Sequence, residues 1–252
     1  MQALETGVRA AAGALSFLTR VPVGSRVALD GADVARGAVL FPLAGAAIGA
    51  LVGLVVVGLD ARLTALVTAG LAVALETLLT GGIHLDAVAD WADGLGARSR
   101  ERALEVMREP TIGAFGATAL LLDLVVKIAA LAATAAGPDA VLAVAAAYAL
   151  GRTVPLALGW ALPYARLEGG SGSILTGSAG EVSRALGVGL GLGLAVAALG
   201  LRGIALAGAA GLAALVIGLV ARRRLGGVTG DVLGAGTELA TTLALVAATA
   251  TR

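Results

Sequence analysis

Apolar residues occur in long blocks that are separated by short polar connections. Seven of these blocks come close to the ~20 residues that a helix needs to cross a bilayer. They cover roughly 38–59, 61–80, 114–136, 138–161, 184–201, 203–221 and 232–250. The pattern predicts an all-α protein, a polytopic membrane helix bundle of about seven transmembrane helices that forms one integral membrane domain over residues 1–252. The fifth and sixth helices are the least clearly divided, because only Arg202 interrupts one long apolar run.

Residues 1–35 are too polar to contain a spanning helix and are expected to form an interfacial helix and a loop. Four apolar residues share one helical face: Val8, Ala11, Leu15 and Leu18. This arrangement predicts an amphipathic helix in the membrane interface. Glu5 and the absence of a convincing small-residue cleavage site argue against a signal peptide. Pro22 ends the helix, and residues 24–35 are expected to be a polar loop.

Composition supports the membrane assignment and removes several kinds of chemistry. Only 14% of residues are charged, against about a quarter in soluble domains. Glycines at four-residue spacing, Gly45, Gly49 and Gly53, predict a ridge where helices approach closely, and Gly187-x-Gly189-x-Gly191 is interpreted in the same way. The sequence has no cysteine, which excludes disulfides, thiolate catalysis and cysteine-bound zinc. No basic tract indicates a nucleic-acid partner.

Basic residues gather in alternate connections between the predicted spans. One set comprises Arg9, Arg20, Arg26, Arg36, Arg98, Arg100, Arg102, Arg108, Arg166, Arg184, Arg222, Arg223 and Arg224, and the opposite set comprises Arg62, Arg202 and Arg252. The positive-inside rule therefore places the N-terminus and residues 81–112 on the cytoplasmic side. A bias to arginine, with Lys127 the only lysine, is typical of a GC-rich bacterial genome. We expect a multi-pass protein of the bacterial cytoplasmic (inner) membrane.

The strongest sign of chemistry lies at residues 81–94, directly after the second apolar block. Asp86, Asp90 and Asp93 are spaced i, i+4 and i+7, so a helix would place them on one face. Neighbouring carboxylates repel one another, and a divalent cation such as Mg²⁺ would remove the conflict. The alternative is a solvated polar face at the membrane boundary. His84, the only histidine, lies off this face and is either a direct participant or a hydrogen-bonding interface residue.

Several polar residues fall inside predicted spans, where such residues are functional candidates. Asp123 and Lys127 are spaced i, i+4 and either neutralise each other or leave Lys127 to meet a phosphate. Arg152 has no nearby acid in the sequence, so we expect it to face a wet cavity or an anion. Asp231 and Glu238 share a face of the last predicted span. Gly234 lies between them on that face and would leave room for a ligand or another helix.

Two polar connections could contribute to a site. Residues 97–113 alternate arginine and glutamate, which indicates either a solvated surface helix or a phosphate-binding segment. Residues 164–172 form a loop with a glycine-rich end, whose length suggests binding or gating.

Ordered motifs along nearly the whole chain resemble those of the cobalamin synthase family, also called adenosylcobinamide-GDP ribazoletransferases. They are Ser16-Phe17-Leu18-Thr19-Arg20-Val21-Pro22-Val23, Arg36-Gly37 with Phe41-Pro42-Leu43, Thr80-Gly81-Gly82-Ile83-His84-Leu85-Asp86 through Asp93-Gly94, Leu104-Glu105-Val106-Met107-Arg108 with Ile112-Gly113, Tyr164-Ala165-Arg166, and Gly226-Gly227-Val228-Thr229-Gly230-Asp231 through Glu238-Leu239. Ala87, Trp91 and Glu109-Pro110-Thr111 depart from the family pattern, and Trp91 could narrow a site.

The resemblance implies a Mg²⁺-dependent transferase of vitamin B12 biosynthesis. Such an enzyme joins adenosylcobinamide-GDP to α-ribazole or its 5′-phosphate and releases GMP. It implies metal binding by Asp86, Asp90 and Asp93, with Asp93 or His84 as the catalytic proton acceptor. The expected substrate- and phosphate-binding residues are Arg98, Arg108, Lys127, Arg152, Arg166, Thr229, Asp231 and Glu238. The oligomeric state stays open, and a homo-oligomer is compatible with the sequence.

Two other functions compete with this hypothesis. Asp90-x-x-Asp93-Gly94-x-x-Ala97-Arg98 matches the first half of the CDP-alcohol phosphatidyltransferase signature, but residues 99–119 contain no aspartate to supply the second half. A cation-coupled transporter would use intramembrane acids as ion ligands, yet the sequence shows no convincing second copy of the aspartate pattern.

Overall fold

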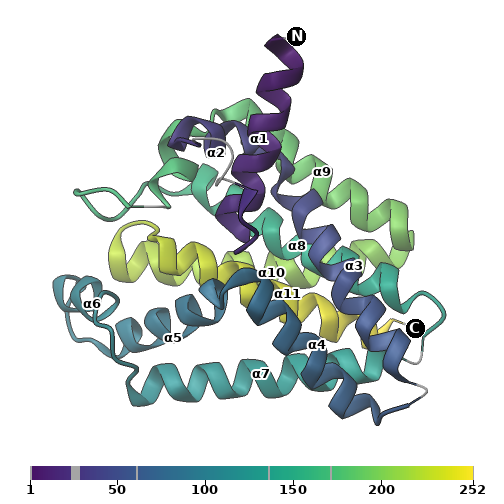
Figure 1. Cartoon of the computed structure of the whole chain (residues 1–252). Helices are drawn as coiled ribbons and strands as arrows, with labels where there is room; N and C mark the ends of the chain where they lie inside the picture. The colour runs from purple at the N-terminus through teal and green to yellow at the C-terminus, as the bar shows by residue number, and fades with distance from the viewer. Residues whose placement is uncertain (1, 24–28, 61, 136, 171, 252) are drawn as a thin grey trace.

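Helices form all the long elements in the computed structural model, which describes residues 2–23, 29–60, 62–135, 137–170 and 172–251 (Figure 1). They are α1 (Gln2–Leu18), α2 (Gly31–Gly37), η2 (Ala38–Leu40), α3 (Phe41–Asp60), α4 (Ala65–Thr80), α5 (Ile83–Gly96), α6 (Arg100–Val106), α7 (Ala114–Thr134), α8 (Ala140–Ala161), η3 (Ile174–Ser178), α9 (Glu181–Leu199), α10 (Leu201–Leu225) and α11 (Gly230–Ala250). Six helical segments, Gly31–Leu59 and α7 to α11, are long and apolar enough to cross a membrane. The predicted all-α polytopic bundle is confirmed.

The second predicted span contains a break, and α4 together with α5 counts as one bent crossing. α4 has 16 residues, which corresponds to roughly 24 Å of helix against a hydrocarbon core of about 30 Å. Gly81 and Gly82 then adopt left-handed φ values of 69° and 70°, which glycine reaches without a steric penalty. The chain bends by 91° into α5. The bend carries the aspartate stretch away from the axis of α4.

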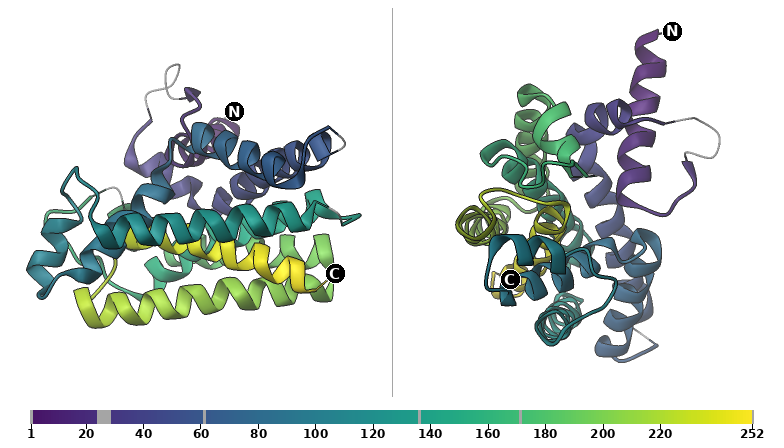
Figure 2. Two further views of the ribbon diagram at one scale, coloured as in Figure 1. Left: turned by 90° about the horizontal axis from the view of Figure 1, so that it is seen from below. Right: turned by 90° about the vertical axis from the view of Figure 1, so that its left-hand side faces the viewer.

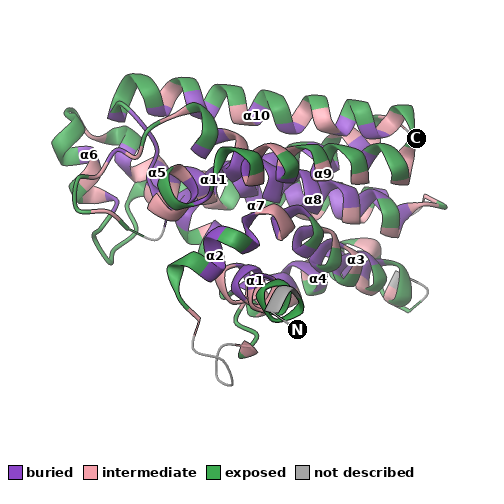
Figure 3. Ribbon diagram, turned by 90° about the horizontal axis from the view of Figure 1, so that it is seen from above, coloured by how far each residue is buried: buried purple, intermediate pink, exposed green. Residues whose placement is uncertain are grey.

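α8 forms the centre of the bundle and packs against α3, α9, α10 and α11 (Figures 2 and 3). The predicted glycine ridge of α3 faces it. A Cβ atom at Gly49 would lie 2.7 Å from Cβ of Tyr148 and 2.8 Å from the carbonyl oxygen of Val144. The backbones therefore approach too closely for any side chain at this point. On α9, Gly187 and Gly191 pack in the same way, whereas Gly189 faces open space.

The polar connections collect at opposite ends of the bundle. α5, α6 and the connections that precede η3 and α11 lie at one end, at the left of Figure 1. The α3–α4, α7–α8 and α9–α10 connections lie at the other end, where α11 also finishes. The arginines predicted for one side include those of α6 and of the end of α10, which lie at the same end as the aspartate stretch, and Arg26, which lies outside the described residues. Arg252, predicted for the opposite side, also lies outside them.

The N-terminal segment contains one more helix than the sequence indicated. Residues 31–35 were expected in a loop, but they belong to α2, which begins after Asp30 with a capping box completed by Asp33. Residues 24–28 of the expected loop lie outside the described part of the chain. α1 packs against α2, and Arg9 forms an ion pair of 2.5 Å with Asp33. Val8 remains 59% exposed, and the placement of α1 in the membrane interface stays a prediction.

Candidate active site

A polar cavity of about 750 Å³ opens beside the α4–α5 bend. Two arginines and two predicted metal ligands line it: Arg20, Arg108, Asp86 and Asp90. The remaining wall comes from the bend itself and from residues 109–112, between α6 and α7. Cationic guanidinium groups and anionic carboxylates around one cavity suit a ligand that carries both phosphate and a divalent metal.

Asp90 carries the clearest electrostatic signature in this cavity. Burial, together with the negative charges of Asp86, Asp231 and Asp93, raises its pKa to about 7. The α5 helix that holds it is 14 residues long and lies outside the six long apolar segments. The site therefore concentrates negative charge that the protein does not fully neutralise. A hard divalent cation would relieve this repulsion, and Mg²⁺ commonly takes one or two carboxylates while water and substrate phosphate complete its shell.

Asp93 contacts the start of α7. Its Oδ2 accepts a hydrogen bond of 2.7 Å from the Gly113 amide, and its Oδ1 accepts one of 2.8 Å from the Gly116 amide. It therefore satisfies free N–H groups at the start of α7, where a negative charge is favourable. A Cβ atom at Gly116 would lie 2.3 Å from Oδ2, so only glycine leaves room for this contact.

Asp86 and Asp90 line the polar cavity, whereas Asp93 does not, and metal binding by the three aspartates stays a prediction. Within the described ranges, no group of three His, Cys, Asp or Glu side chains is placed to hold a metal ion. Asp86 and Asp90 fit a metal that is completed by substrate and water. Asp93 accepts one amide hydrogen bond on each oxygen and keeps further lone pairs, so its role as a metal ligand or proton acceptor stays a prediction.

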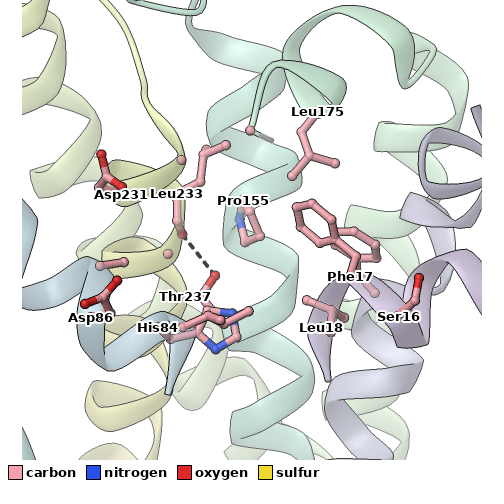
Figure 4. Close-up of a pocket in the computed structure, with 16 residues that line it drawn as sticks. Ser16, Phe17, Leu18, His84, Asp86, Pro155, Leu175, Asp231, Leu233 and Thr237 are labelled. Carbon is pink, nitrogen blue, oxygen red and sulfur yellow. Dashed lines mark hydrogen bonds between the residues drawn. The ribbon is translucent and has the colours of Figure 1, made fainter. Parts of the chain in front are cut away.

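His84 lines a second cavity, of about 350 Å³, on the other side of Asp86 (Figure 4). The side chain is 6% exposed, and its Nδ1 has no hydrogen-bond partner among the described residues. Asp86 lines both cavities. The structure thus places His84 next to the polar cavity, but its side chain lines the second cavity.

The start of α11 reaches the same region. Thr229 caps the helix by accepting a 3.2 Å hydrogen bond from the Val232 amide, and its hydroxyl donates to Oδ2 of Asp231. Arg166 forms an ion pair of 2.9 Å with Asp231. At Gly234 a Cβ atom would lie 2.5 Å from Cβ of Ala87. α5 therefore fills the space at Gly234. Of the two alternatives expected there, the structure shows a helix and not a vacant ligand site.

Three predicted phosphate or substrate ligands lie instead in a buried ionic network between helices. Lys127 is within 2.6 Å of Glu76 and 2.5 Å of Glu238, and it is fully buried. Arg152 lies 3.5 Å from Glu76, and the hydroxyl of Tyr148 donates to the same carboxylate. Lys127, Arg152 and Glu238 therefore have protein partners in place of a phosphate. Acids from other helices, distant in sequence, pair with these cations, so spacing along one helix could not reveal the pairing. Nε and Nη2 of Arg152 still lack a hydrogen-bond partner among the described residues.

Asp123, one of the two partners considered for Lys127, lies at the edge of this network. Asp123 accepts a hydrogen bond of 2.8 Å from Thr242 through Oδ1, while its Oδ2 has no partner among the described residues. The direct i, i+4 neutralisation of Lys127 by Asp123 is absent from the ion pairs of the described residues.

The remaining arginines divide into cavity and scaffold groups. Arg108 lines the polar cavity and pairs with Glu168, whereas Arg98 is exposed and lines neither cavity. Arg20 was not singled out from the sequence, although it belongs to the conspicuous Ser16–Val23 motif. Arg100 and Arg224 donate to carbonyl oxygens at the ends of neighbouring helices. Some of the basic residues therefore hold together the connections at this end of the bundle.

These features define an integral membrane protein with a polar site, lined by arginines and aspartates, at one end of a helix bundle. The chain belongs to the cobalamin-5-phosphate synthase family, whose model matches residues 10–249. It is 39% identical over 240 residues to the adenosylcobinamide-GDP ribazoletransferase of Citrobacter koseri, covering 92% of this chain and 96% of the relative. The proteins of the same name from Shigella flexneri and Escherichia coli K12 are 39% and 40% identical over the same shares.

The family match selects the first of the three functional hypotheses. The chain is an enzyme of cobalamin biosynthesis and acts in nucleotide-loop assembly. No solved structure matches the chain.

Proposed function

We propose that the enzyme joins adenosylcobinamide-GDP to α-ribazole or its 5′-phosphate and releases GMP, with Mg²⁺ bound at Asp86 and Asp90. The names of the relatives support the choice of substrates. The observation that carries the proposal is the polar cavity in which these two carboxylates lie with Arg20 and Arg108. A diphosphate needs both cationic side chains and a metal, and this cavity offers ligands for each.

The reaction makes one P–O bond and breaks another. A ribose hydroxyl of the acceptor attacks the phosphorus that remains with the cobinamide. The bond from that phosphorus to the bridging oxygen breaks, GMP leaves with this oxygen, and the hydroxyl proton passes to a carboxylate of the cavity. Bound Mg²⁺ would neutralise charge on the diphosphate. The protein mainly binds and orients the two substrates, as this class of reaction demands.

Arg20 and Arg108 are the residues that would bind phosphate oxygens. Both are exposed at the mouth of the site. Among the described residues, the only ion pair that either of them forms is the 3.1 Å contact of Arg108 with the exposed Glu168. Exposed pairs of this kind contribute little and are readily exchanged. Phosphate could therefore replace Glu168 on Arg108 at a small cost.

The proposal is tested with purified protein in detergent, supplied with adenosylcobinamide-GDP, α-ribazole 5′-phosphate and Mg²⁺. We expect GMP release that requires the acceptor, stops when EDTA is added and resumes when excess Mg²⁺ is restored. A parallel reaction with a CDP-linked lipid and a polar alcohol should give no CMP. Failure to release GMP, or release that ignores the acceptor, would contradict the proposal.

A further inference from the structure

The cavity beside the polar site is chemically unlike it. Its walls are mainly apolar and come from the end of α1, the starts of α3 and α5, the middle of α8, residues 172–175 and the start of α11. Phe17 and Phe41 stack at one wall, with ring centroids 5.5 Å apart and planes inclined by 19°. Pro155 and Leu175 add flat and branched apolar surfaces. A volume of about 350 Å³ lies in the usual range for small-molecule pockets.

One polar side chain in this cavity retains unused hydrogen-bonding capacity. Nδ1 of His84 is buried without a partner among the described residues. The hydroxyl of Thr237, by contrast, already donates to the carbonyl oxygen of Leu233 at 3.0 Å. Figure 4 shows His84, Thr237 and Asp86 on one side of the cavity and Phe17 and Leu18 on the other. Buried polar atoms are normally paired, so His84 is equipped for a partner that the protein does not supply.

Asp86 and Ile83 separate the two cavities and line both of them. A molecule with an aromatic part and a sugar can therefore place the aromatic part in the apolar cavity and the sugar at Asp86. The diphosphate of the second substrate then occupies the polar cavity across the same wall. This arrangement puts the sugar hydroxyl next to the phosphorus it must attack.

We propose that the apolar cavity is the binding site for the flat aromatic base of the ribazole acceptor. The base lies against Phe17 and Pro155, and the imidazole of His84 turns to hydrogen-bond its ring nitrogen, because Nδ1 is not accessible from the cavity as it stands. The inference rests on the proposed function, because the acceptor is the substrate whose base must be bound. It adds the location of the acceptor, and it makes His84 a binding residue rather than the proton acceptor.

Arg184 maintains one wall of this site from a distance. It is buried on α9 and donates from Nη1 to the carbonyl oxygens of Leu175 and Thr176 at 2.8 and 2.9 Å. These bonds hold the segment around η3 against α8, so that Leu175 closes the cavity. Arg184 is a positioning residue in this scheme and does not touch the base.

The first experiment separates acceptor binding from donor binding in the purified full-length enzyme. Leu175→Trp fills the cavity, and Leu78→Trp places the same ring on a surface where the native leucine is 76% exposed. We expect Leu175→Trp to raise the KM for α-ribazole 5′-phosphate by about tenfold or more while the KM for adenosylcobinamide-GDP stays within about twofold. Leu78→Trp should change neither. An increase in the donor KM alone would overturn the proposal, even though GMP release would still support the function.

The second experiment examines His84 and identifies the ligand directly. His84→Leu should raise the acceptor KM, and His84→Asn should restore much of it because its amide can occupy the position of Nδ1. Free benzimidazole should bind wild-type protein in calorimetry, compete with the acceptor and fail to bind Leu175→Trp. This binding measurement needs no turnover, so it remains decisive if GMP release is not observed. Absence of benzimidazole binding would overturn the proposal. Displacement of bound benzimidazole by phospholipid but not by the acceptor would assign the cavity to a lipid chain instead.

Discussion

Asp86, Asp90 and Asp93 share one face of α5, but their surroundings give them different roles. Asp90 lies half-buried among other acids, which raise its pKa. Asp93 accepts hydrogen bonds from two backbone amides at the start of α7. The identity of a residue and its position on a helix therefore do not decide its chemistry. The partner that arrives from another helix decides it.

Replacing Asp90 by asparagine should separate activity from stability. The amide is a weaker ligand for a divalent cation, so GMP release is expected to fall by about a hundredfold or more. Stability in detergent should be unchanged or higher, because the substitution removes repulsion between carboxylates. Thermal unfolding and the GMP assay measure the two effects.

Asp139→Asn is the matched control for this substitution. Asp139 pairs with Arg202 at the opposite end of the bundle, away from both cavities. The Asp139→Asn variant should therefore release GMP at the wild-type rate. Near-normal turnover by Asp90→Asn would remove Asp90 from the metal site.

At the scale of the elements, the broken α4–α5 helix and the buried ionic network act together. Glu76 on α4, Lys127 on α7 and Glu238 on α11 meet in one network beside Tyr148 and Arg152 of α8. The three outer helices also lead into the active site at the α5 bend, at the Asp93 cap and at Thr229. The network therefore fixes the positions of α4, α7 and α11 relative to one another along the bundle axis, and these helices lead into the site.

Lys127→Met should strongly destabilise the protein. It leaves Glu76 and Glu238 buried without their shared cation, a type of change that costs about 3–5 kcal/mol. The loss should appear as a lower thermal unfolding temperature in detergent. Combining it with Glu238→Gln should recover part of the stability, because the second change removes one of the unpaired charges. Simple addition of the two single effects would indicate that the residues do not act as a pair.

The α3–α8 contact allows a second test with a control in the same helix. Gly49→Ala places a methyl group against the backbone of α8 and should lower stability by about 1–3 kcal/mol. Gly58→Ala meets no atom within 4 Å and should be neutral or slightly stabilising. Equal effects on the unfolding temperature would show that the close approach at Gly49 is unimportant.

In the whole molecule, the fold collects distant segments at one end of the bundle. Residues from α1, α3, α5, α7, α8 and α11 line the two cavities together with the α4–α5 bend and the α6–α7 connection, and the basic connections lie at this end. The positive-inside rule predicts that this end faces the cytoplasm. Both soluble substrates would then reach the site without crossing the membrane.

Single cysteines can test this orientation, because the native sequence has none. Glu101→Cys lies on exposed α6 at the site end, and Leu63→Cys lies in the exposed α3–α4 connection at the other end. A membrane-impermeant maleimide should label Leu63→Cys in intact cells. Glu101→Cys should be labelled only after permeabilisation. The reverse pattern would place the active site outside the cytoplasm.

Local sequence patterns were sufficient for the helical membrane fold, the glycine ridge at Gly45–Gly53 and the acidic stretch beside the membrane. These features depend on apolar block length, residue size and helical spacing, all of which are properties of one segment. Tertiary structure decided the partners: Asp93 with α7, Gly234 with α5, and Lys127 with Glu76 and Glu238. It also joined Arg20 to the cavity and left Nδ1 of His84 without a hydrogen-bond partner in the described part of the chain. Such pairings arise when helices far apart in the sequence pack together, so no single segment contains the information that selects them.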